Sequence, residues 1–190
     1  LIWLLPIVVI LVAGAGIGWA VRQAPRQAAA PAASASATAT RSPAPVTGGA
    51  NLLANGRLQP NGGGPPAGWH LQTFQGTPPR WSYAPGGPAG GDREVTISSS
   101  SGTDTAWVGS DVNALKPGMK ATLSGYVKTG AIPGDGAGAS LQLVCHGADG
   151  KETGQAASPP LRGNVNWQQV QATINIPSGT TACLPQLRLG

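Results

Sequence analysis

Residues 119–129 read MKATLSGYVKT, a run in which apolar and polar side chains alternate. The apolar positions of this alternation are Met119, Ala121, Leu123 and Val127. The positions between them carry Lys120, Thr122, Ser124, Tyr126 and Lys128. A period of two places successive side chains on opposite faces of a β-strand, so the run predicts a strand with one face in a core and the other in water.

The same alternation recurs through residues 51–190. Its apolar positions are Val95 and Ile97; Leu141, Leu143 and Cys145; Val170, Ala172, Ile174 and Ile176; and Cys183, Leu187 and Leu189. Gly, Pro, Asn and Asp separate these runs, and Asp149-Gly150 is a hairpin-type turn. No stretch here shows a clear helical period. The pattern therefore predicts an all-β fold, a β-sandwich.

Composition agrees with a β-fold and limits the partners. The 190 residues include 29 Gly and 18 Pro, and only 10% are charged, which argues against a helical bundle. The net charge of +5 suggests nucleic acid at first sight, but residues 51–190 carry nine basic and seven acidic side chains. Because no arginine-rich run exists to neutralise a row of phosphates, we predict no nucleic-acid partner.

The first 50 residues differ from the rest. Residues 1–21 read LIWLLPIVVILVAGAGIGWAV, without a charge, and as a helix they would span about 31 Å, the thickness of a bilayer core. We predict a transmembrane helix over residues 1–22, with a long signal-peptide core as the alternative. Ala, Pro, Ser and Thr make up 21 of the 27 residues at 24–50, so residues 23–50 are predicted to be a disordered linker.

The orientation of this segment is set by two opposing signals. Arg22 and Arg26 follow the apolar run, and positive charge favours the cytoplasmic side. The Ala/Pro/Ser/Thr linker and the β-rich domain after it are typical of surface proteins and favour the outside. We give the second signal more weight and predict a single-pass membrane protein, a signal-anchored bacterial surface protein with an extracytoplasmic sandwich.

Five segments carry a resemblance to a known family. They are NLLANGRLQ at 51–59, PAGWH at 66–70, WVGSDVNALKPGMKATLSGYVKT at 107–129, NWQQVQATINIPSGT at 166–180 and LPQLRLG at 184–190. In these segments the chain resembles carbohydrate-binding modules of the family 4 and family 9 type, over nearly all of 51–190. The resemblance implies a jelly-roll sandwich of galactose-binding-like topology. It also implies a module that binds polysaccharide without chemistry, of the kind appended to polysaccharide-degrading enzymes and surface proteins.

The chain departs from that family in two places. Family members continue past the L-x-L-G segment into a last strand, which is lacking here, since the sequence stops at Gly190. Members often hold a structural calcium, partly through an acid in the opening segment. Here that segment carries neutral Gln59 with Arg57 nearby, which are poor surroundings for calcium. We therefore predict no cofactor, with calcium left as a disfavoured alternative.

Sugar sites combine flat aromatic rings with amides and charges that bond the hydroxyl groups. Trp81, Tyr83 and Tyr126 are the predicted rings, and Arg80, Gln142 and Gln169 the predicted polar partners. Gln171 shares the polar face of its strand with Gln169. Trp69 and Trp167 are interpreted as packing residues, and Trp107 is left ambiguous between the two roles.

The two cysteines, Cys145 and Cys183, fall on apolar faces of two strands. In an exported domain we predict a disulfide between them, with two buried thiols as the alternative.

The sequence holds no catalytic pattern. It lacks G-x-S-x-G and H-E-x-x-H, and His70 and His146 are isolated. Asp92 and Glu94 are two residues apart and more typical of a turn than of a glycosidase cleft. The predicted function is a membrane-tethered, non-catalytic module that binds a polysaccharide or cell-wall glycan. Two alternatives stay open: a binding-silent structural, protein-interaction or sensor ectodomain, and an accessory module of a larger glycoside hydrolase.

Overall fold

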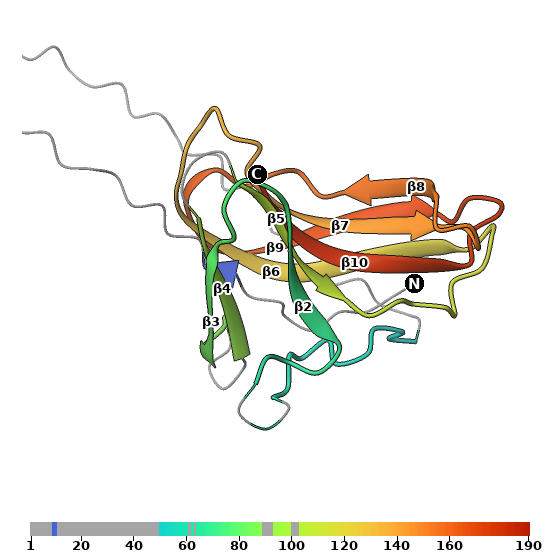
Figure 1. Ribbon diagram of the computed structural model, residues 1–190, viewed down its shortest axis with the longest axis horizontal. Helices are drawn as coiled ribbons and strands as arrows, with labels where there is room; N and C mark the ends of the chain where they lie inside the picture. The colour runs from blue at the N-terminus through green and yellow to red at the C-terminus, as the bar shows by residue number, and fades with distance from the viewer. Residues whose placement is uncertain (1–8, 11–49, 61, 63, 89–92, 100–102) are drawn as a thin grey trace, which may run out of the picture.

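The computed structural model describes residues 9–10, 50–60, 62, 64–88, 93–99 and 103–190 (Figure 1). All regular secondary structure in these ranges is β-strand, which confirms the all-β prediction. The strands are β1 (Val9–Ile10), β2 (Trp69–Gln75), β3 (Arg80–Pro85), β4 (Arg93–Ser98), β5 (Asp104–Gly109), β6 (Lys120–Ile132), β7 (Ala139–His146), β8 (Glu152–Ala157), β9 (Gly163–Asn175) and β10 (Ala182–Leu189).

The strands form two layers around one core. A five-stranded antiparallel sheet has the order β2-β5-β10-β7-β8. Against it pack the long antiparallel pair β6-β9 and the sheet β1-β4-β3, with β9 on β7 and β8 and β6 on β7 (Figure 1). The core between the layers is made of inward-facing side chains such as Leu58, Ile97, Trp107, Leu141 and Leu187.

The alternating runs predicted most of this core. Val95, Ile97, Leu141, Leu143 and Cys145 are all buried, as are the predicted positions of β10. The hairpin prediction is also confirmed, because β7 and β8 are joined by a turn in which Gly150 has a φ of 75°. A positive φ is easy only for glycine, which explains its place after Asp149.

Two expectations for residues 119–129 are wrong. Met119 is 47% exposed, because it lies in the turn before β6, where its amide donates to the carbonyl of Lys116. The polar face of β6 is not wet along its length, since Thr122 and Ser124 are buried. The Oγ1 atoms of Thr122 and Thr173 lie 3.0 Å apart across the β6-β9 pair, so this burial is partly compensated by a hydrogen bond.

Strands β2, β3 and β8 were not predicted from the sequence. Strand β2 is interrupted by a bulge between Thr73 and Gln75, β3 lies in a Pro/Gly-rich stretch, and β8 reads ETGQAA with no large apolar residue. All three gain their order from a neighbouring strand, since β2 pairs with β5, β3 with β4 and β8 with β7.

The opening segment 51–59 is attached to β2 by Asn55. Its Nδ2 donates to the carbonyls of Gln59 and Ala67 at 3.0 Å each, and its Oδ1 accepts from the Gln59 amide at 2.7 Å. Its carbonyl accepts from the buried indole of Trp69 at 3.2 Å. Asn55 has a φ of 49°, a conformation that Asn adopts more readily than most residues. The Asn-Gly opening therefore stabilises the packing of this segment against β2.

Most of the predicted membrane helix, and residues 23–49 of the predicted linker, lie outside the described residues. Of residues 1–22, only Val9 and Ile10 are described, and they form β1, parallel to β4 opposite Val95 and Thr96. At these two positions the backbone is extended where the sequence predicts a helix. The described part of the chain contains no helix with the length and apolar character needed to cross a membrane.

Candidate functional site

The outer face of the β6-β9 pair gathers polar and aromatic side chains. Leu123 and Ala172 pair across the two strands and face the core, so the alternate positions face outward. Tyr126 lies directly opposite Gln169, and Ser124 opposite Gln171. Two of the predicted sugar-binding residues, Tyr126 and Gln169, are therefore neighbours in the structure.

This row continues with Lys128 and Trp167. The ammonium nitrogen of Lys128 lies 5.7 Å from the centre of the Trp167 ring, within the range of a cation–π contact. Trp167 is half-buried and alternates in phase with Gln169, so it belongs to the outer face. The sequence suggested a packing role for Trp167, but the strand register places it beside Tyr126's row.

One amide on this face lacks a partner. Nε2 of Gln171 is buried and makes no hydrogen bond among the described residues. A buried N–H group without an acceptor is unfavourable, so Gln171 carries an unmet hydrogen-bonding need beside this row. Gln169 is 9% exposed, whereas Tyr126 and Trp167 are half-buried, so the two rings are more accessible than this amide.

Strand β3 holds three other predicted residues, Arg80, Trp81 and Tyr83. Trp81 pairs with Ile97, and Tyr83 pairs with Val95, so both rings lie on the core side of the β3-β4 hairpin. Trp81 remains 41% exposed, and its ring packs on buried Trp107 with centroids 5.2 Å apart. Arg80 is exposed at the start of the strand.

The Tyr83 ring is held on several sides. Its hydroxyl donates to the Leu58 carbonyl, and the Arg93 guanidinium carbon lies 5.4 Å from its ring centre. Burial raises the pKa of Tyr83 above its usual value, while the charge of Arg93 acts in the opposite direction. These contacts are those of a ring that fastens β3 and the opening segment to the core.

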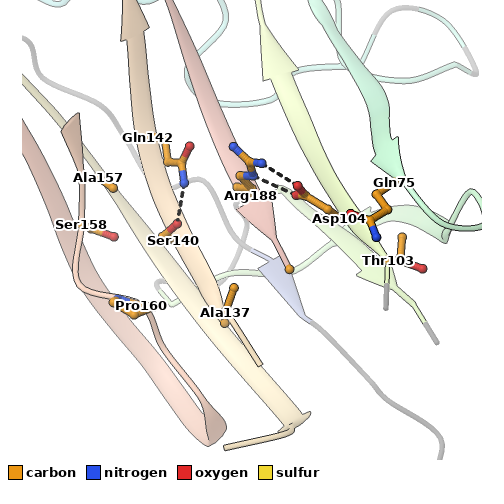
Figure 2. Close-up of a pocket in the computed structure, with 12 residues that line it drawn as sticks. Gln75, Thr103, Asp104, Ala137, Ser140, Gln142, Ala157, Ser158, Pro160 and Arg188 are labelled. Atoms are coloured by element: carbon orange, nitrogen blue, oxygen red, sulfur yellow. Dashed lines mark hydrogen bonds and ion pairs between the residues drawn. The ribbon is translucent and has the colours of Figure 1, made fainter. Parts of the chain in front are cut away.

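Gln142, the sixth predicted residue, lies apart from the others on β7. It lies on the outer face of the five-stranded sheet, in a hollow of about 530 Å³ that also contains Arg188, Asp104 and Gln75 (Figure 2). Arg188 and Asp104 form an ion pair there. The six predicted residues thus occupy three separate places: β3, the β6-β9 face and this hollow.

Cys145 and Cys183 are directly opposite each other on β7 and β10 and form a disulfide. Both side chains are fully buried in the core, so the bond joins two central strands of the five-stranded sheet. Within the described ranges, no three His, Cys, Asp or Glu side chains gather closely enough to hold a metal ion.

Sequence reasoning missed several polar and aromatic residues on these outer faces. Arg188 lies between Leu187 and Leu189, so alternation alone puts it on the outer face, which was an available signal. Phe74 is the chain's single Phe, but its position depends on the β2 bulge, which the sequence does not reveal. Lys128 and Trp167 meet only because β6 and β9 pair in one register.

Comparisons with known proteins give little further guidance. No protein-family model matches the chain, and no curated protein matches it. Among solved structures, the chain is similar to the enzymatically active domain of tailspike protein 4 of bacteriophage CBA120, with a TM-score of 0.47 and 9% sequence identity. The match covers 65% of this chain and 17% of that chain. A likeness at this level carries no argument, so the resemblance to carbohydrate-binding modules stays a prediction from the sequence.

Proposed function

We propose that residues 51–190 are a non-catalytic carbohydrate-binding module of the family 4 and family 9 type, a jelly roll that binds polysaccharide on the outer face of β6 and β9. The observation that carries the proposal is the row in which Tyr126 faces Gln169 and Lys128 lies over Trp167. Aromatic rings, amides and a cation in one row are the groups that recognise a sugar chain.

The accessible part of the row on β6 runs from Tyr126 to Lys128, over which a strand advances about 7 Å. Tyr126 and Trp167 offer ring faces to the C–H edges of pyranoses. Gln169 and Gln171 supply amides to hydroxyl groups, and Gln171 can meet the need of its unpartnered Nε2 by turning toward the ligand.

The same proposal includes a membrane tether. Its support is the uncharged run at residues 1–21 followed by the Ala/Pro/Ser/Thr-rich segment. In this arrangement the module lies outside the cytoplasm and meets cell-wall or environmental glycan. The partner is thus a polysaccharide, and no cofactor takes part.

The test is retention of the full chain on insoluble β-glucan, xylan and wall polymers. We expect retention on at least one polymer, weakened about tenfold or more in Tyr126→Ala, since one stacked ring is worth roughly 1.4 kcal/mol or more in such a site. Met119→Ala is the matched control, because Met119 is exposed in the turn before β6 and outside the row.

Three other results of this experiment would contradict parts of the proposal. A folded chain retained by no polymer would favour the structural, protein-interaction or sensor role. Retention that Tyr126→Ala leaves unchanged would keep sugar binding but remove it from the β6-β9 face. Hydrolysis of the polymer by the chain would contradict the non-catalytic assignment.

A further inference from the structure

Strand β9 has one unpaired edge. It is hydrogen-bonded to β6 on one side, and no described strand pairs with its other side. The β6-β9 ladder is regular from the pair Lys120–Asn175 to the pair Val127–Gln168, so residues 168–175 of β9 form an unbroken stretch. These eight residues extend over about 23 Å, which is more than the length of a typical β-strand.

The hydrogen bonds to β6 show which backbone groups face this edge. The amide of Ile176 donates to the Met119 carbonyl at 2.7 Å, so Ile176 is a hydrogen-bonded position of the antiparallel ladder. Hydrogen-bonded and non-hydrogen-bonded positions alternate along such a strand. The N–H and C=O groups of Gln171, Thr173 and Asn175 therefore point away from β6. Among the described residues, these backbone groups have no hydrogen-bond partner.

The edge of β9 also lacks the usual protection against pairing. Residues 163–176 read GNVNWQQVQATINI, without a charged side chain or a proline. Thr173 and Asn175 are exposed, and Gln171 is half-buried. Edge strands of native proteins are normally protected by charges, prolines or bulges, because an unprotected edge pairs with another strand. None of these features is present over residues 168–175.

The other sheet edges in the described ranges are protected. Strand β2 has the bulge between Thr73 and Gln75, and β8 has an irregularity where its pairing with β7 ends. Strand β3 begins at charged Arg80 and ends at Pro85. The edges of β1 and β6 lie against each other. Of the described edges, that of β9 is therefore the one best suited to pair with another strand.

A second copy of this chain offers a matching edge. Two antiparallel copies of one strand are related by a two-fold axis perpendicular to the sheet, so the unpaired N–H groups of each copy meet C=O groups of the other. Because residues 163–176 are uncharged, this arrangement brings no like charges together. The assembly ends at two copies, since pairing uses up the β9 edge and the other edges are protected.

We propose that β9 is a self-association surface, through which two copies of the chain form a dimer with a continuous four-stranded β6-β9-β9-β6 sheet. The backbone groups of Gln171 and Thr173 form hydrogen bonds between the copies. The two-fold axis leaves the outer faces of both β6-β9 pairs on the same side of this sheet. Two glycan-binding rows then face one surface, a consequence that rests on the proposed function, whereas the dimer itself does not.

Sedimentation of the full chain in detergent micelles measures the association, and amide hydrogen exchange locates it. We expect a dimer in which the Gln171 and Thr173 amides exchange about tenfold or more slowly at high protein concentration than at low. The amides of Val170 and Ala172, which face β6, should be equally protected at both concentrations. A monomer at every concentration, or a dimer in which the Gln171 and Thr173 amides still exchange rapidly, would overturn the proposal.

Thr173→Pro tests the contact itself. Proline removes an N–H that faces the partner copy and none that faces β6, so the dimer dissociation constant should rise about tenfold or more while the β6-β9 ladder is kept. Thr173→Val is the matched control, because both variants lose the 3.0 Å hydrogen bond with Thr122 but valine keeps the backbone N–H. Equal dissociation constants for the two variants would contradict the proposal. Should the proline variant fail to fold, the amide exchange of the unaltered chain decides the question.

Discussion

Strands β3 and β6 both carry aromatic side chains, but the two strands use them differently. Trp81 and Tyr83 face the core side of the β3-β4 hairpin, where one packs on Trp107 and the other donates to the Leu58 carbonyl. Tyr126 faces outward, opposite Gln169. Strand β3 looks the more exposed from its composition, yet its rings belong to packing.

The difference lies in the partner strand. Val95 and Ile97 of β4 are fully buried, and cross-strand pairs share one face of a sheet, so the rings opposite them lie on the core side, where Trp81 still keeps 41% of its surface exposed. Tyr126 pairs with Gln169, a polar residue, on the face that points away from Leu123 and Ala172. An aromatic residue in a strand is thus assigned to packing or to binding by the residue across from it.

The largest expected effect concerns the scaffold that both strands share. Replacing both cysteines by Ala removes a cross-link between residues 38 apart and should lower the free energy of unfolding by about 4 kcal/mol. Because both sulfurs are in the core, polysaccharide retention below the unfolding midpoint should not change. Urea unfolding and retention, measured on one preparation, check both parts. A selective loss of retention would show that the core and the β6-β9 face are coupled.

Tyr83→Ala tests the packing side of the comparison. The ring is half-buried against the core, so we expect a loss of about 2 kcal/mol in the free energy of unfolding and no change in retention. Urea unfolding gives the first quantity. If retention falls while stability holds, Tyr83 belongs to a binding site and the assignment of β3 to packing is wrong.

Much of the fold, and less of the site, could be predicted from the sequence. Alternation identified β4, β6, β7, β9 and β10, since a buried face imposes its period on the residues. It could not identify β8, whose order comes from pairing with β7. It placed Tyr126 and Gln169 on outward faces, but their meeting depends on the register of two strands 43 residues apart in sequence, and that information is not local.

Trp167→Ala tests the binding side. Loss of the ring removes a stacking surface and the cation–π partner of Lys128, so retention should weaken about tenfold. The half-buried position limits the expected cost in unfolding free energy to about 1 kcal/mol. Affinity electrophoresis in soluble polysaccharide measures the first effect. A loss of stability with unchanged migration would return Trp167 to the packing role suggested by the sequence.

The smallest effect is the alkaline behaviour of Tyr83. Its pKa is raised in the folded state, chiefly by burial, so folding favours the neutral phenol. This contribution is complete below the unfolded pKa of about 10 and is lost as pH rises from there through the raised folded value. Tyr83→Phe should lack this component of the pH dependence. Urea midpoints for both proteins between about pH 8 and about pH 11 test it, and identical slopes would contradict it.

The most direct test of the glycan-binding face compares Tyr126→Ala with Trp81→Ala. Retention on the polymer that binds the unaltered chain, and the urea midpoint, are measured for both. We expect the two substitutions to have opposite effects. Tyr126→Ala loses retention with little change in the urea midpoint. Trp81→Ala keeps retention and loses about 1 kcal/mol of stability with its Trp107 contact. The reverse pattern, with retention lost only in Trp81→Ala, would place the glycan on β3 and contradict the account.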